Sequence, residues 1–134
     1  MKKEYLNPDT LFPSRAFGFS QVVTSQGGKW IHCSGQTAWD KEMNIVGAGD
    51  LQQQMRQSLE NVRLALAAAG AVPEDVVRVT VYIADYQPDE IGPVSSAMAD
   101  FFKDNPPAST LIGVQALALP DFRVEVEVTA VIAE

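Results

Sequence analysis

Residues 123–132 read Arg-Val-Glu-Val-Glu-Val-Thr-Ala-Val-Ile, and this alternation of polar and apolar side chains predicts a β-strand. Successive side chains of a strand point to opposite faces of the sheet, so the segment has one apolar and one polar face. An apolar sheet face must be covered by another layer, for which helices elsewhere in the chain are candidates. The apolar face comprises Val124, Val126, Val128, Ala130 and Ile132, and the polar face comprises Arg123, Glu125, Glu127 and Thr129.

Residues 51–69 are predicted to form an amphipathic helix. Asp50 can cap its start, and Gln53, three residues on, can bond back to it. Gly70 suits the left-handed turn that ends a helix. The apolar residues recur at steps of three and four, which places them on one stripe of the helix: Leu51, Met55, Leu59, Val62, Leu66 and Ala69.

A second helix is predicted over residues 91–101. Pro93 fits this helix only in its first turn, where the missing N–H leaves no hydrogen bond unmade. Its apolar face is predicted to consist of Ile91, Val94, Met98 and Phe101.

Four further β-rich runs are predicted to be strands. Residues 17–23 and 29–34 flank Gly27-Gly28, so they are expected to pair as an antiparallel hairpin. Residues 76–83 and 110–117 complete the set, whereas residues 40–49 mix turn formers and charges and are predicted to be a loop. The order strand, strand, helix, strand, helix, strand, strand predicts one α+β domain over residues 1–134, with both helices on one face of a mixed sheet.

Composition narrows the functions that are open to the chain. No apolar run is long enough to cross a membrane, and Met1-Lys2-Lys3 is not followed by the apolar core of a signal peptide, which favours the cytosol. Cys33 is the only cysteine, so an intrachain disulfide is excluded. Cys33 and the neighbouring His32 are together too few ligands for a zinc site built from cysteine and histidine, which needs three or four. A net charge of −7 without a basic cluster argues against nucleic acid. The sequence has no phosphate-binding glycine loop, and no cofactor is expected.

Three segments resemble the RidA (YjgF) family of small trimeric proteins, many of which are enamine or imine deaminases. They are residues 17–21 (Phe-Gly-Phe-Ser-Gln), residues 33–36 (Cys-Ser-Gly-Gln), and residues 107–110 (Pro-Ala-Ser-Thr) followed by the strand 124–128. The resemblance extends from about Asn7 to Ala133. It implies a chorismate-mutase-like fold and a homotrimer with small-molecule sites in clefts between subunits.

The family resemblance also marks an arginine that this chain lacks. In family deaminases an arginine after Pro-Ala binds the substrate carboxylate, and a glutamate on the last strand holds the attacking water. The glutamate matches Glu125, whereas Ser109, with Thr110 beside it, occupies the arginine position. Two charge-assisted bonds contribute about 3 to 6 kcal/mol together, so their loss predicts a poor 2-aminoacrylate deaminase. The pattern resembles the subgroups of the family that lack this arginine.

Other substrate-binding positions follow from the same resemblance. Phe19 keeps an aromatic ring where the family commonly has tyrosine, and Ser95 aligns with a family asparagine. Ser34 and Gly35 match residues at the floor of the cleft. Glu125 also has a structural explanation as a solvated or ion-paired strand residue, and Arg123 is either a paired charge or a replacement for the missing arginine.

Three functions remain open from the sequence. The first is hydrolysis of an imine, enamine or related bond of a small metabolite, with Glu125 positioning water. The second is a trimer that binds or senses a metabolite without turnover. The third is the older family description of endoribonuclease or translation inhibitor, against which the acidic composition argues.

Overall fold

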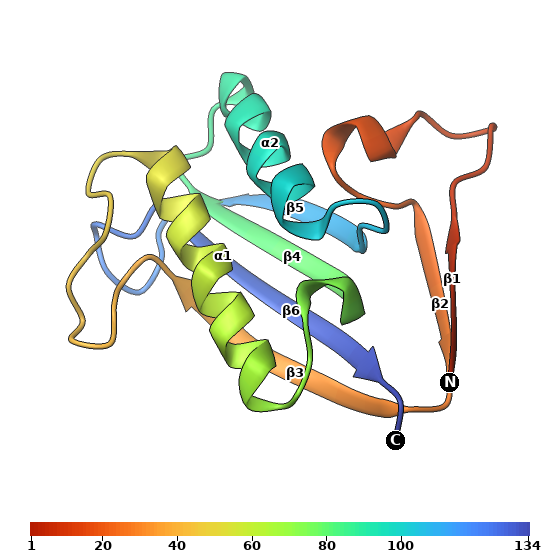
Figure 1. Cartoon of the computed structure of the whole chain (residues 1–134). Helices are drawn as coiled ribbons and strands as arrows, with labels where there is room; N and C mark the ends of the chain where they lie inside the picture. Colours follow the sequence, from red (N-terminus) through yellow and green to blue (C-terminus); the bar gives the residue numbers. More distant parts are fainter.

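The computed structural model describes residues 1–134 and consists of a four-stranded sheet, two helices and a separate two-stranded ribbon (Figure 1). The sheet has the order β3-β6-β4-β5, and only the β4–β5 pair is parallel. Both helices lie on one face of this sheet (Figure 1). The α+β class predicted from the sequence is therefore confirmed. The strands are β3 (Lys29–Thr37), β4 (Val76–Ala84), β5 (Ala108–Val114) and β6 (Val124–Ile132).

Helix α1 (Leu51–Ala68) forms where the apolar stripe predicts it. The Asp50 carboxylate accepts a hydrogen bond from the backbone N–H of Gln53 at 3.0 Å, and Gly70 follows with a φ of 79°. Leu51, Met55, Leu59, Val62 and Leu66 are buried against the sheet and the second helix. Neither this helix nor any other is long and apolar enough to cross a membrane.

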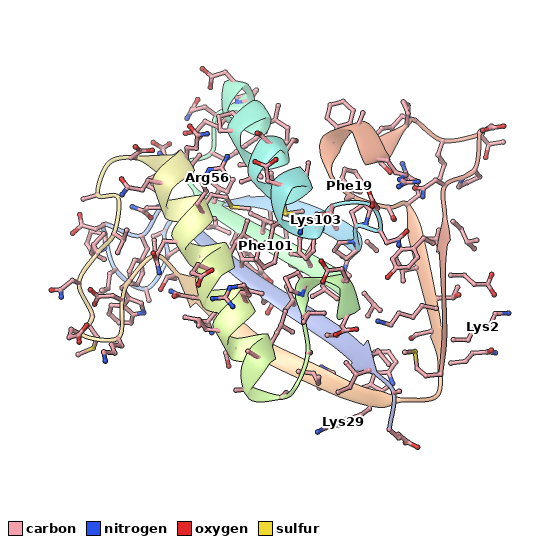
Figure 2. All side chains as sticks on the ribbon, viewed as in Figure 1. Lys2, Phe19, Lys29, Arg56, Phe101 and Lys103 are labelled. Atoms are coloured by element: carbon pink, nitrogen blue, oxygen red, sulfur yellow. The ribbon has the colours of Figure 1, made fainter.

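Helix α2 (Ile91–Phe102) differs from the prediction in the face that it buries. Phe102 is fully buried, whereas Phe101 is only partly buried and lies toward α1 (Figure 2). Ile91 is largely exposed, although Val94 and Met98 are buried as predicted. Residues seven and eight positions after Val94 lie near the same side of a helix, so periodicity alone does not choose between the two phenylalanines.

The predicted hairpin between residues 17–23 and 29–34 is wrong. Strand β2 (Val22–Gln26) pairs with β1 (Lys2–Leu6), a strand that the sequence analysis did not predict, and β3 pairs with β6 instead. Gly27 and Gly28 have φ angles of 70° and 89°, which glycine adopts without strain. They form a corner that carries the chain from the ribbon into the main sheet.

The main sheet has β3 at one edge and β5 at the other, and the N-terminal segment is attached at the β5 edge, beside the start of β5. The Ser20 backbone N–H donates to the Pro107 carbonyl at 2.9 Å, and the Ser20 hydroxyl donates to the Pro106 carbonyl at 2.6 Å. A 3-10 helix, η1 (Ser14–Phe17), precedes this attachment and contacts α2. The N-terminal segment therefore brings its phenylalanines next to α2 and β5. Strand β5 also begins two residues earlier and ends three residues earlier than predicted.

Candidate functional site

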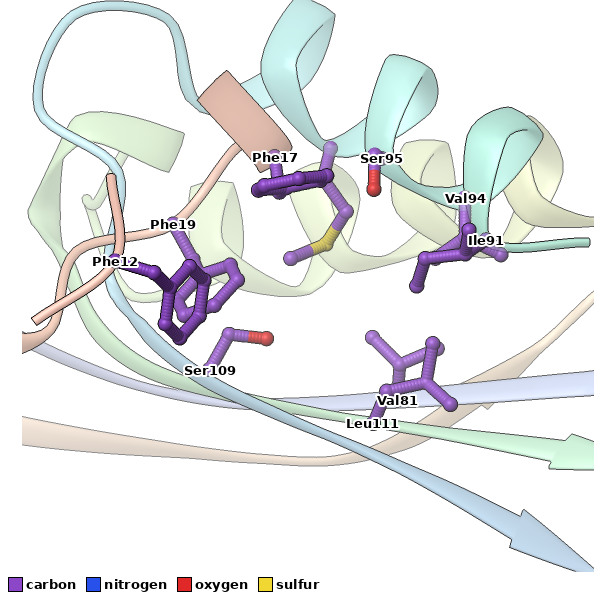
Figure 3. A pocket seen from close by; sticks show the side chains of 10 residues that line it. Phe12, Phe17, Phe19, Val81, Ile91, Val94, Ser95, Ser109 and Leu111 are labelled. Carbon is purple, nitrogen blue, oxygen red and sulfur yellow. The ribbon is translucent and has the colours of Figure 1, made fainter. Parts of the chain in front are cut away.

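A cavity of about 420 Å³ lies between η1, α2 and the helix-covered face of the sheet (Figure 3). We call it the apolar cavity, because eight of its ten lining residues are hydrophobic and none is charged. Ser95 of α2 and Ser109 of β5 are its polar residues. The lining residues are Phe12, Phe17, Phe19, Val81, Ile91, Val94, Ser95, Met98, Ser109 and Leu111.

Gly18 sets how closely η1 approaches α2. Its φ of 85° lies in the left-handed region, and a Cβ added there would stand 2.9 Å from the Ala99 nitrogen and 3.1 Å from the Ser95 carbonyl oxygen. Only glycine fits both this conformation and this contact. Because Gly18 separates Phe17 from Phe19, the contact holds both aromatic side chains at the cavity wall.

The third phenylalanine, Phe12, completes an aromatic wall. Its ring meets that of Phe17 edge to face at a centroid distance of 6.1 Å and that of Phe19 at 5.9 Å. Such edge-to-face pairs add stabilisation beyond the apolar area that they bury. Phe12 was not identified from the sequence, since the Leu-Phe-Pro run that contains it has no helix or strand period. The spacing of three phenylalanines within eight residues was the available signal.

The two serine hydroxyls enter the cavity from opposite sides, Ser95 from the helix and Ser109 from the strand (Figure 3). Neither side chain forms a hydrogen bond within the chain. A serine hydroxyl can donate one bond and accept two, so both are available to a bound molecule. Neither supplies the positive charge that would neutralise a carboxylate.

The sheet face away from the helices, which we call the open face, carries the predicted catalytic residue. Glu125 lies between the buried Val124 and Val126 and therefore projects onto the open face. A Cβ at Gly35 would stand 2.7 Å from the Glu125 Cδ and 2.8 Å from its Cγ. The Glu125 side chain thus occupies the space that the missing Cβ of Gly35 leaves. The pairing register of β3 shifts between Cys33 and Gln36, so Gly35 and the exposed Ser34 lie at this irregularity.

Neighbouring open-face groups are bonded to one another. The Arg78 guanidinium donates to the Thr110 hydroxyl, and the Tyr82 hydroxyl donates to a Glu127 carboxylate oxygen. This bond to Glu127 raises the pKa of Tyr82, to which burial and the nearby carboxylates of Glu127 and Glu125 also contribute. Glu125 itself has no hydrogen-bond or ion-pair partner within the chain.

The predicted site residues therefore form two groups within one chain. Phe19, Ser95 and Ser109 line the apolar cavity. Gly35, Glu125 and Thr110 lie on the open face. There Gly35 is in contact with the Glu125 side chain, and the Thr110 hydroxyl is bonded to Arg78. Ser109 and Thr110 are separated because consecutive strand residues point to opposite faces.

Arg123 is a paired charge in this structure. Its guanidinium bonds both Glu90 carboxylate oxygens, at 2.9 and 3.0 Å, and the Ala84 carbonyl at 3.0 Å. Arg123 does not line the apolar cavity. Other cations are dispersed, with Lys2, Lys29, Arg56 and Lys103 on separate parts of the surface (Figure 2). No lysine or arginine lines the apolar cavity with Ser109.

Cys33 and His32 do not form a catalytic pair. Cys33 packs against the core, and its burial raises the pKa of the thiol, which disfavours the nucleophilic thiolate. His32 is exposed and stacks on Trp30 at a centroid distance of 6.3 Å.

Known proteins resemble this chain over most of its length. The family model Endoribonuclease L-PSP matches residues 12–132. A RutC family protein from Pyrococcus horikoshii is 31% identical over 112 residues, 84% of this chain and 85% of that protein. A 2-iminobutanoate/2-iminopropanoate deaminase from Dermatophagoides farinae is 30% identical over 122 residues, 91% of each chain.

A solved structure agrees with the whole fold. The Rid protein family member YyfB from Yersinia pestis has a TM-score of 0.93 at 39% identity, with 98% of this chain and all of that chain covered. A member of the YjgF/YER057c/UK114 family from Mycobacterium tuberculosis has a TM-score of 0.67 at 26% identity, with 98% and 100% covered. These matches agree with the motifs at residues 17–21, 33–36 and 107–110, and the chain belongs to the RidA (YjgF) family.

Proposed function

We propose that this chain binds a small, uncharged metabolite in the apolar cavity and acts poorly on imines that carry a carboxylate. The observation that carries the proposal is the lining of the cavity, in which Ser95 and Ser109 are the polar groups and no cation is present. Burying an ionised carboxylate without a partner costs several kcal/mol. The volume lies within the range of about 300 to 1,000 Å³ that is typical of small-molecule sites.

The direct test compares hexanamide with hexanoate, which have the same chain length and differ in charge. Isothermal titration should show binding of the amide and a dissociation constant at least about a hundredfold weaker for the carboxylate, since burial of the unpaired charge is unfavourable. Ser109→Arg should reverse this preference by supplying a guanidinium. Equal affinity of the wild-type protein for both compounds would refute the proposal.

Hydrolysis of an uncharged imine, enamine or related bond is the second candidate function. Glu125 favours it, because this carboxylate lies over Gly35 without an internal partner and so remains free to position a water molecule. The 2-iminobutanoate/2-iminopropanoate deaminase from Dermatophagoides farinae, at 30% identity, supports imine hydrolysis as the reaction type, whereas the compounds in its name carry the carboxylate that this cavity does not pair. Product analysis after incubation with a ligand separates turnover from binding, since a sensor returns its ligand unchanged.

Catalysis at the apolar cavity by Glu125 requires more than one subunit. Within one chain Ser109 and Glu125 lie on opposite faces of the sheet, so both can reach one ligand only if the open face of one subunit approaches the cavity of another. We therefore propose a cytosolic homotrimer with sites in the clefts between subunits. Light scattering coupled to size exclusion should give the mass of three chains at micromolar concentration, and a stable mass of one or two chains would rule this assembly out.

RNA cleavage receives no support from the charge distribution. A phosphate backbone is bound mainly through clustered lysine and arginine, and the net charge of this chain is −7.

A further inference from the structure

We infer that the apolar cavity takes a neutral aromatic molecule whose ring packs against Phe12, Phe17 and Phe19 and whose polar group bonds Ser95 or Ser109. This inference rests on the proposed function and names the chemical class of its ligand.

Within a single subunit, the aromatic wall has ring surface that no other residue covers. Phe12 is 55% exposed and Phe17 is 45% exposed, although both line the cavity. The Phe12 ring already meets the other two rings edge to face, with interplanar angles of 66° and 67°. A further aromatic ring can extend this arrangement, because its positive edge meets the negative face of a phenylalanine.

The remaining lining residues can pack against the other side of the ligand ring. It is formed by branched or unbranched aliphatic side chains from α2 and the sheet, namely Val81, Ile91, Val94, Met98 and Leu111. Methionine sulfur also makes favourable contacts with aromatic rings. Figure 3 shows Phe12 and Phe19 on one side of the cavity and aliphatic side chains on the other, so a ligand ring would pack between an aromatic wall and an aliphatic one.

The two serines are the hydrogen-bonding groups that the cavity offers to a ligand. They enter from α2 and from β5, and each hydroxyl can donate one bond and accept two, so a primary amide or a hydroxyl of the ligand can bond to either. A carboxylate could also accept these bonds, but its charge has no counterion in the cavity.

Benzamide and cyclohexanecarboxamide provide a matched test, since they share the amide and the ring size and only benzamide is aromatic. Isothermal titration of the full chain should show that benzamide binds about three- to tenfold more tightly, the range expected for aromatic pairing. Phe19→Leu keeps an apolar side chain and should reduce the ratio of the two affinities, which is compared within the variant because Phe19 lines the cavity and affects both ligands. Trp30→Leu, at an exposed aromatic residue outside the cavity, should leave both affinities unchanged.

Two outcomes would overturn the inference in distinguishable ways. Equal binding of the two amides by the wild-type protein would refute the aromatic class and leave the proposed binding of uncharged metabolites intact. Failure of both these amides and hexanamide to bind would refute both proposals. If Phe19→Leu does not fold, as circular dichroism would reveal, Phe17→Leu provides the same comparison from the neighbouring wall position.

Discussion

Ser109 and Glu125 lie on opposite faces of one four-stranded sheet. Ser109 lines the apolar cavity under α2, whereas Glu125 projects from β6 onto the open face and lies over Gly35. The fold thus places on opposite faces of the sheet the two positions that the family resemblance assigns to substrate carboxylate binding (Ser109) and to holding water (Glu125). A ligand bound in the cavity as proposed would meet serine hydroxyls and phenylalanine rings, and it would meet Glu125 only through a second subunit.

Gly18 is expected to control the shape of the apolar cavity. In Gly18→Val the new side chain collides with the backbone at Ala99 and Ser95, so η1 should move away from α2 and carry Phe17 and Phe19 with it. Affinity for benzamide should fall by about tenfold or more, because the cavity loses most of its aromatic wall. Titration calorimetry measures this loss.

Gly49→Val is the matched control for this substitution. Gly49 also has a positive φ, of 74°, but a Cβ there would meet nothing within 4 Å. Both variants should lose stability from the unfavourable backbone conformation, and only Gly18→Val should lose ligand affinity. An equal effect of the two variants on benzamide binding would show that Gly18 does not position the wall.

Met55→Asp is expected to unfold the protein. Met55 is 0% exposed in the core between α1 and the sheet, so the substitution buries a carboxylate that has no partner. The penalty of several kcal/mol approaches the whole free energy of unfolding of a typical domain, about 5 to 15 kcal/mol.

Gln52→Asp places the same charge three residues earlier, on the exposed side of α1. Because it lies in the first turn, where negative charge is favourable, it should leave the melting temperature unchanged or slightly raised. Thermal unfolding followed by circular dichroism compares the melting temperatures of Met55→Asp and Gln52→Asp. A wild-type melting temperature for Met55→Asp would mean that Met55 does not lie on the buried face of α1.

The Tyr82–Glu127 hydrogen bond predicts a pH dependence on the alkaline side. Since the bond raises the pKa of Tyr82 above its ordinary value of 10.0, the folded state holds this proton more tightly than the unfolded state. Its contribution to stability is therefore complete below pH 10 and is lost as the pH rises through the folded pKa. Glu127→Gln should shift the Tyr82 phenolate transition, measured by ultraviolet absorbance, to lower pH.

Tyr82→Phe identifies which transition belongs to this residue, because Tyr5 and Tyr86 also titrate. The pKa of Tyr5 is raised as well, mainly by burial, so the assignment requires this control. Identical titration curves for wild type and Glu127→Gln would contradict the bond.

Local patterns in the sequence predicted much of the main sheet and its helical cover. The stripe from Leu51 to Leu66 and the alternation from Val124 to Ala130 each depend on neighbours a few residues away, and both are buried as predicted. Strand partners depend on distant contacts. Gly27-Gly28 is compatible with a hairpin or a corner, and the choice between them follows from the pairing of β1 with β2 and of β3 with β6.

The candidate site was predictable only in part for the same reason. Phe19, Ser95 and Ser109 come from three distant segments, and the family resemblance, not a local pattern, indicated all three. Phe12 joins them because Gly18 allows η1 to approach α2, which the sequence of residues 12–19 does not reveal. The alternation of β5 already implies that Ser109 and Thr110 separate, but it does not say which of them faces a cavity.

The central claim is that the apolar cavity has no cation to bind a substrate carboxylate, and one rate measures it. In this assay an oxidase generates an imine from an amino acid, and semicarbazide traps the imine that the protein does not hydrolyse. The wild-type protein should consume the imine at a rate within about twofold of the uncatalysed rate, since two charge-assisted bonds are absent. Ser109→Arg should raise consumption measurably, although Phe19, which lacks the hydroxyl of the family tyrosine, should hold it below that of a family deaminase. Fast turnover by the unmutated protein would contradict the claim, and its loss in Arg123→Ala would identify Arg123 as the replacement cation.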